Sequence, residues 1–169
     1  MSIKTNYTNK TVNKLSSNLI LFSNEKFELK KLKKNLSNSE LSYISDLLKA
    51  NDLKKKIFLF EVNSKKKIFL ISIKNDFKTS DIESLGAEFY GRINYGKNAE
   101  YFLVSDTIES KHKNFLSHFL HGLKLKSYEF KKYKTKKETR ILSINILGNK
   151  NKPSIKDQLK FKALEEGTF

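Results

Sequence analysis

The three histidines of the chain, His112, His118 and His121, all lie in one short segment. A spacing of three residues puts His118 and His121 on one helix face, where two imidazoles can share a divalent metal. The segment lacks the H-E-x-x-H pattern, and no carboxylate lies between the two histidines to act as a base. We therefore interpret the histidines as solvent-facing or partly packed side chains rather than metal ligands.

A second segment, Gly91–Asn98, follows the phosphate-loop pattern G-x-x-x-x-G-K but departs from it at the next position. Ser or Thr is needed there to bind magnesium, and Asn98 has no hydroxyl. The order of elements is also reversed, because a phosphate loop follows a strand and opens a helix. We interpret the segment as a turn from a helix to a strand.

Other candidates for catalysis are weaker. Glu165 and Glu166 are adjacent and point to different faces of a helix, while Asp76, Asp81 and Glu83 lie near a helix start, where they stabilise the helix dipole. There is no G-x-S-x-G elbow for a serine nucleophile, and the absence of cysteine excludes disulfides and thiolate metal sites. The sequence thus predicts no catalytic residue, no cofactor-binding residue and no metal ligand.

The chain is strongly basic: its 169 residues include 34 Lys and Arg against 18 Asp and Glu, for a net charge of +16. Only Arg92 and Arg140 are arginines, although arginine is favoured for bidentate recognition of phosphate and guanine. We interpret runs such as Lys54–Lys56 and Lys65–Lys67 as solvated surface, and nucleic acid is not an expected partner. The alternative hypothesis is a stand-alone basic module for nucleic acid or an ADP-ribose-like ligand. The aromatic and basic segment Tyr128–Lys137 would then stack bases, although its spacing equally suits a packed strand or turn.

No apolar stretch approaches the roughly 18 residues of a membrane span. Leu19–Phe22 is too short for the core of a signal peptide. We expect a soluble cytoplasmic protein.

Apolar periodicity predicts strands and helices in alternation. The expected strands are Ile3–Val12, Asn18–Phe22, Ile57–Val62, Ile68–Ile73, Tyr101–Val104 and Arg140–Leu147; the expected helices are Ser39–Ala50, Ser80–Ile93, Asn114–Tyr128 and one that begins at Pro153-Ser154. Such alternation, with one hairpin in the middle, is typical of an α/β fold. We expect a mixed sheet flanked by helices on both faces.

Three details of these helices lead to further predictions. Ser80–Glu83 has the pattern of a capping box. Gly86 costs the same helix about 1 kcal/mol relative to alanine, so we expect a close approach to the sheet there. In the last helix, Ile155, Leu159 and Ala163 recur every four residues and the pattern is still running at Phe169. We expect a helix that is cut off from the rest of its protein.

The run Phe119–Lys136 resembles the end of the N-terminal domain in the leucyl (cytosol) aminopeptidase family, where a helix ending in G-L-x-L-x-x-Y-x-F is followed by Y-K-T-K. Ser84–Ala87 is similar to an L-G-A segment of an earlier helix in that domain. Lys162–Phe169 is similar to the A-x-x-E-G stretch that leads into the family's catalytic domain. The matching positions in the run are Gly122, Leu123, Leu125, Tyr128, Phe130, Tyr133 and Lys134, which we interpret as packing and domain-joining residues.

The resemblance implies a macro-domain-like N-terminal domain over residues 1–150, and over 151–169 the start of a helix that links it to a catalytic domain. The parent enzymes are cytoplasmic, hexameric metalloaminopeptidases, hydrolases that remove N-terminal residues with two divalent metals, zinc or manganese. Their N-T-D-A-E-G-R and A-R-D-L motifs are missing from this sequence. The expected role is therefore structural, as a fragment or split gene product that partners a catalytic domain or full-length aminopeptidase subunits and is inactive alone.

Overall fold

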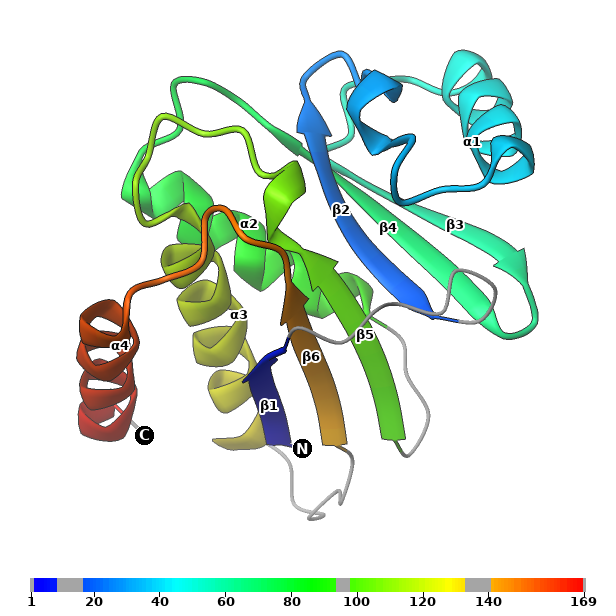
Figure 1. Ribbon diagram of the computed structural model, residues 1–169. Helices are drawn as coiled ribbons and strands as arrows, with labels where there is room; N and C mark the ends of the chain where they lie inside the picture. Colours follow the sequence, from blue (N-terminus) through cyan, green and yellow to red (C-terminus); the bar gives the residue numbers. More distant parts are fainter. Residues whose placement is uncertain (1, 9–16, 94–97, 133–140, 169) are drawn as a thin grey trace.

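The computed structural model describes residues 2–8, 17–93, 98–132 and 141–168 (Figure 1). The strands are β1 (Ser2–Tyr7), β2 (Asn18–Asn24), β3 (Ile57–Asn63), β4 (Lys66–Ile73), β5 (Asn98–Val104) and β6 (Ile141–Leu147). The helices are α1 (Asn38–Ala50), α2 (Thr79–Arg92), α3 (Phe115–Lys132) and α4 (Ile155–Thr168), with short 3-10 turns η1 (Lys30–Leu32) and η2 (Ser105–Thr107).

The six strands form one mixed sheet in the order β1-β6-β5-β2-β4-β3. Only β3 and β4 pair in antiparallel fashion, as the predicted hairpin, and every other neighbouring pair is parallel. The predicted α/β class with a mixed sheet is confirmed.

The central strands are buried on both faces. In β2, Leu19 and Leu21 belong to one apolar layer with α1, whereas Ile20 and Phe22 belong to the other layer with α2 and α3. Continuous apolar strands of this kind are typical of parallel sheets covered on both sides. The ribbon shows α1 apart from the α2 and α3 pair, which confirms helices on both faces (Figure 1).

The capping predicted at Ser80–Glu83 is wrong. The helix α2 starts earlier, at Thr79, because the Asp81 carboxylate accepts a hydrogen bond from the backbone N–H of Lys78 at 2.8 Å. A capping box lies instead at α1, where Ser37 and Glu40 exchange hydrogen bonds between side chain and backbone at 3.2 and 2.9 Å. Both sites have the S-x-x-E pattern, and at α2 a closer acidic side chain takes the capping position.

Gly86 packs against a helix rather than against the sheet, which corrects the sequence prediction. A Cβ atom at Gly86 would lie 2.0 Å from the carbonyl oxygen of Phe119 in α3. A Cβ atom at Gly122 would lie 1.9 Å from the carbonyl oxygen of Glu83 in α2. The two glycines therefore let the backbones of α2 and α3 touch, and the apolar faces of both helices turn together onto the sheet.

Two further predictions differ from the structure, and a third is tested only in part. Helix α3 continues to Lys132, so Tyr128–Lys132 is helical and not the expected strand or turn. The predicted N-terminal strand is described only as β1, and 9–16 lie outside the described residues, as do Tyr133 and Lys134. The run Lys65–Lys67 is only partly solvated, because Lys66 begins β4 and is 1% exposed.

The connection from β6 to α4 is fixed by hydrogen bonds to η2. The hydroxyl of buried Ser105 donates to the carbonyl oxygens of Leu147 and Lys150, and the Asp106 carboxylate accepts from two backbone N–H groups of the connection. Gly148 has a φ of 117°, which favours glycine. These contacts set where α4 begins.

Candidate functional site

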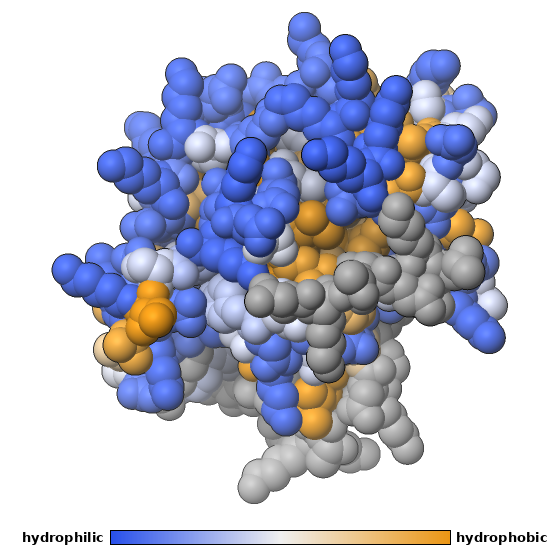
Figure 2. All heavy atoms as spheres, viewed as in Figure 1, coloured by the Kyte–Doolittle hydropathy of each residue, from blue (hydrophilic) through white to orange (hydrophobic). Residues whose placement is uncertain are grey.

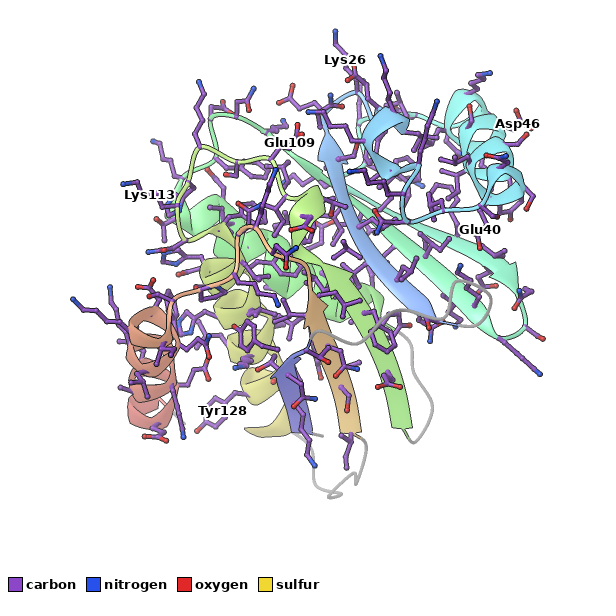
Figure 3. All side chains as sticks on the ribbon, viewed as in Figure 1. Lys26, Glu40, Asp46, Glu109, Lys113 and Tyr128 are labelled. Atoms are coloured by element: carbon purple, nitrogen blue, oxygen red, sulfur yellow. The ribbon has the colours of Figure 1, made fainter. Side chains whose placement is uncertain are left out.

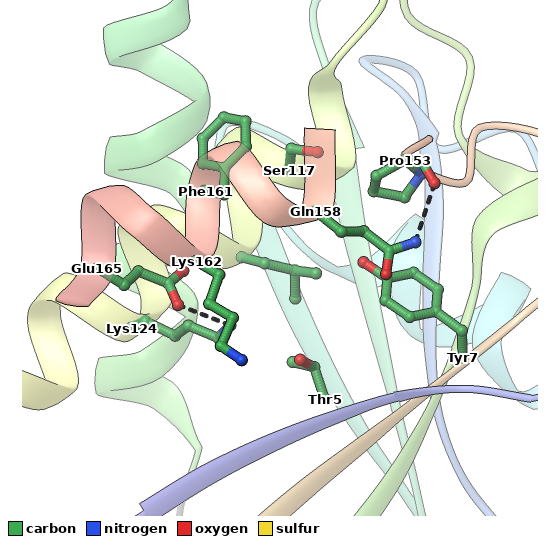
Figure 4. Close-up of a pocket in the computed structure, with 10 residues that line it drawn as sticks. Thr5, Tyr7, Ser117, Lys124, Pro153, Gln158, Phe161, Lys162 and Glu165 are labelled. Atoms are coloured by element: carbon green, nitrogen blue, oxygen red, sulfur yellow. Dashed lines mark hydrogen bonds and ion pairs between the residues drawn. The ribbon is translucent and has the colours of Figure 1, made fainter. Parts of the chain in front are cut away.

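A cavity of about 360 Å³ lies between the edge strand β1, helix α3 and helix α4 (Figure 4). Its walls carry hydroxyl groups, two lysines and a carboxylate over an apolar floor. The residues that line it are Thr5, Tyr7, Ser117, Leu120, Lys124, Pro153, Gln158, Phe161, Lys162 and Glu165. The volume lies in the range of small-molecule sites.

Phe161 attaches α4 to α3. It is the buried apolar residue of α4, at 8% exposure, and its ring meets those of His118 and His121 edge-on with centroids 5.0 and 5.6 Å apart. The two histidines are therefore part of the packing under α4.

Glu165 supplies the negative charge of the cavity. Its carboxylate accepts a hydrogen bond from Nζ of Lys124 at 3.2 Å and lies 3.8 Å from Nδ1 of His121. The second distance is too long for a hydrogen bond, and His121 Nδ1 is buried without a hydrogen-bond partner in the described part of the chain. Lys162 also lines the cavity, and no ion pair joins it to another described residue.

Three hydroxyl groups reach the cavity without a hydrogen bond to any other described residue, those of Thr5, Tyr7 and Ser117. Ser117 is a buried polar residue, at 6% exposure. Burial, with a smaller contribution from the Glu165 charge, raises the pKa of Tyr7 to about 12. The Tyr7 hydroxyl is a hydrogen-bond donor at physiological pH, as it would be at its ordinary pKa.

The other predicted candidates do not assemble into a catalytic centre. His118 Nδ1 in α3 lies 2.9 Å from the carboxylate of Glu83 in α2, so this pair links the two helices. His112 Nε2 lies 3.0 Å from the Thr79 hydroxyl. Across the ranges that the structure describes, no group of three or more His, Asp or Glu side chains is placed to hold a metal ion. The two metals of the resembling family have no fitting ligand set there.

The glycine-rich segment Gly91–Asn98 begins in the last turn of α2 and ends on β5, with 94–97 outside the described residues. The predicted order of helix before strand is confirmed, and it is opposite to that of a phosphate loop.

A second cavity, of about 460 Å³, lies at the carboxyl ends of β2 and β4, where open α/β sheets usually bind ligands. Four carboxylates line it, against a single lysine: Glu25, Glu28, Asp76 and Glu109, with Lys26. This surface is locally negative, although the chain has a net charge of +16. It would repel the phosphates of the ADP-ribose-like ligand that the alternative hypothesis names.

The lysine-rich surface is largely solvated. Lys26 and Lys113 extend away from the ribbon, whereas Glu40 lies beneath α1 (Figure 3). There it binds Nζ of Lys66 at 2.6 Å, with both side chains buried. Most lysine runs are therefore surface, as predicted, and Lys66 is the structural exception.

The outer face of α4 is apolar and uncovered. Ile155 is 78% exposed and Leu159 62% exposed, with Ala163 exposed beside them. Figure 2 shows an apolar patch over α4, set in hydrophilic surroundings. The predicted spacing of these residues is confirmed, but they point away from the domain.

Of the residues that line the cavity, sequence analysis weighed only Glu165 as a chemical candidate, and it missed the hydroxyls and the lysines. Tyr7, Ser117 and Lys162 come from three elements that are far apart in the chain. No local spacing links them, so no motif indicates them.

No helix in the described ranges is long and apolar enough to cross a membrane.

Comparison with known proteins gives a likeness of fold. No family model matches the sequence, and no curated protein matches it significantly. The structure is similar to that of a mutant of tomato leucine aminopeptidase, with a TM-score of 0.67 and 16% identity over 98% of this chain. The chain spans 36% of the tomato chain. It is also similar to the macrodomain of DarG from Thermus aquaticus, with a TM-score of 0.53 and 8% identity over 88% of this chain and 100% of the macrodomain.

Proposed function

We propose that this chain is a non-catalytic domain of the kind found at the N-terminus of cytosolic leucyl aminopeptidases, with a structural role in assembly with a catalytic domain. The observation that carries the proposal is the match of 98% of the chain, in fold, to about a third of a leucine aminopeptidase. The macrodomain likeness shows the fold and adds no role.

The residues behind the sequence resemblance support a packing role. Gly86 of the L-G-A segment and Gly122 of the longer run are the two positions where α2 and α3 touch. Leu123, beside Gly122, is fully buried in the same core. Residues that serve backbone contact and core packing fit a domain that contributes shape rather than chemistry.

The uncovered face of α4 supports an assembly role. Ile155, Leu159 and Ala163 form one stripe on a helix whose inner side buries a single large apolar residue, Phe161. A stripe of three side chains is much smaller than the roughly 800 Å² per partner of a stable dimer. We therefore propose that the stripe contacts a larger surface that brings further contacts, the catalytic domain of an aminopeptidase. In this proposal 1–150 form the macro-like domain, 151–169 join it to that partner, and the assembly is cytoplasmic.

We expect the purified chain to be inactive. With leucine amides as substrate and added manganese or zinc, turnover should equal the metal-only blank, because the described residues offer no two-metal ligand set. The control is a full-length leucyl aminopeptidase under the same conditions. Metal-dependent turnover that copurifies with the chain through two different columns would contradict the proposal.

A further inference from the structure

We propose that the cavity between β1, α3 and α4 is a binding site for a small organic carboxylate with an apolar side group, of the size of a free amino acid. This site is separate from the α4 stripe and from the assembly role. The proposal rests on the hydrogen-bond donors of the cavity that have no protein partner, on its charge and on its apolar floor.

The cavity presents more hydrogen-bond donors than its own walls use. The hydroxyls of Tyr7 and Ser117 and the ammonium of Lys162 have no partner among the described residues. Ser117 is 6% exposed as a whole residue and lines the cavity. Tyr7 is 37% exposed, and like any tyrosine it keeps its phenolic proton and can donate it at physiological pH. Donors that converge in this way fit a ligand rich in acceptor oxygens.

The charge of the cavity selects an anion. Glu165 is neutralised by Lys124, whose Nζ lies 3.2 Å from the carboxylate. Lys162, which is solvent-exposed and lines the cavity, therefore adds a positive charge that no described carboxylate pairs with. A carboxylate that binds Lys162 and a hydroxyl forms charge-assisted hydrogen bonds, which are stronger than neutral ones.

The apolar floor selects an organic ligand over a simple ion. Leu120 and the ring of Phe161 form this floor. A cavity of about 360 Å³ holds an aliphatic amino acid with room for water. None of the α4 residues of the cavity belongs to the stripe, although Lys162 lies one turn from Leu159 on a neighbouring face of the helix.

The test is a titration of the isotopically labelled chain followed by NMR, with three probes that share one aliphatic skeleton. 4-Methylpentanoate carries the carboxylate alone, leucine carries the carboxylate and the ammonium, and leucinamide carries the ammonium alone. We expect saturable shifts of the amides around Tyr7, Ser117 and Gln158 with 4-methylpentanoate and leucine, with a dissociation constant on the order of 1 mM. Leucinamide should give none.

Two variants locate the binding. Tyr7→Phe keeps the ring and removes the hydroxyl, and Lys162→Ala removes the charge. Each should weaken leucine binding by about tenfold, the effect of one hydrogen bond to a charged group. Lys160→Ala is the matched control, because Lys160 is exposed on the same helix and does not line the cavity.

Binding of leucinamide at the strength of leucine would overturn the proposal, as would no binding of either carboxylate. Unchanged affinity in both Tyr7→Phe and Lys162→Ala would do the same. If Lys160→Ala weakened binding as much as Lys162→Ala, binding would depend only on the overall positive charge of α4. That result would also overturn the proposal.

Discussion

Replacing Gly122 with alanine will destabilise the native fold by about 3 kcal/mol or more, at the upper end of what overpacking costs. The new Cβ atom would lie 1.9 Å from the carbonyl oxygen of Glu83, and this neighbour is backbone, which a rotamer change cannot move. The Gly86→Ala variant meets the Phe119 carbonyl in the same way, at 2.0 Å. In both variants α2 and α3 must separate, which opens the core beneath them.

Gly91→Ala is the matched control, because Gly91 also lies in α2 and its Cβ would have no atom within 4 Å. This variant should be as stable as the parent or gain up to about 1 kcal/mol from helix propensity. Urea unfolding followed by circular dichroism measures all three. A free energy of unfolding for Gly122→Ala within about 0.5 kcal/mol of the parent would contradict the close contact of α2 and α3.

Replacing Glu40 with glutamine will cost about 3 kcal/mol of the free energy of unfolding. The amide keeps an oxygen for the Ser37 cap but removes the charge that faces Lys66 at 2.6 Å. Lys66 is 1% exposed, and taking the counter-charge from a buried ammonium costs about 3 to 5 kcal/mol. Replacing both residues, as Glu40→Leu with Lys66→Met, should recover most of the loss, since an apolar pair needs no charge.

The exposed pair of Glu61 and Lys67 is the control on the same hairpin. Its atoms are 3.7 Å apart and the Glu61 side chain is 65% exposed. Glu61→Gln should change stability by less than about 0.5 kcal/mol. Equal effects of Glu61→Gln and Glu40→Gln would mean that the buried pair is not formed as described.

The order of strands and helices was predictable because it depends on local apolar periodicity. The element that packs against Gly86 was not predictable, because a glycine in a helix indicates a close approach but not which element makes it. Lys66 illustrates the same gap: a lysine run is typical of surface, and only the fold shows that its middle residue faces the Glu40 carboxylate under α1. The capping box was misassigned because α2 begins two residues earlier than the Ser80–Glu83 pattern indicates, with Asp81 accepting from the backbone N–H of Lys78.

The cavity and the α4 stripe depend on tertiary placement. A four-residue repeat such as Ile155, Leu159 and Ala163 indicates one apolar helix face, but it does not indicate whether that face meets this domain or another surface. Similarly, Tyr7 and Ser117 become neighbours only because β1 joins the sheet beside β6 and α3 packs behind it.

The assembly role is tested most directly by a pull-down with the immobilised chain. A lysate of the cells that express the chain is passed over it, and the retained protein is assayed for hydrolysis of leucine amides. The measurement compares the parent chain with Leu159→Lys, which charges the apolar stripe, and with Lys160→Ala as the control. We expect the parent and the control to retain a protein that contains an aminopeptidase catalytic domain, with metal-dependent hydrolysis. The Leu159→Lys chain should retain at least about tenfold less, the effect of losing one central contact of an interface. No captured hydrolysis, or equal capture by the parent and Leu159→Lys, would contradict the account.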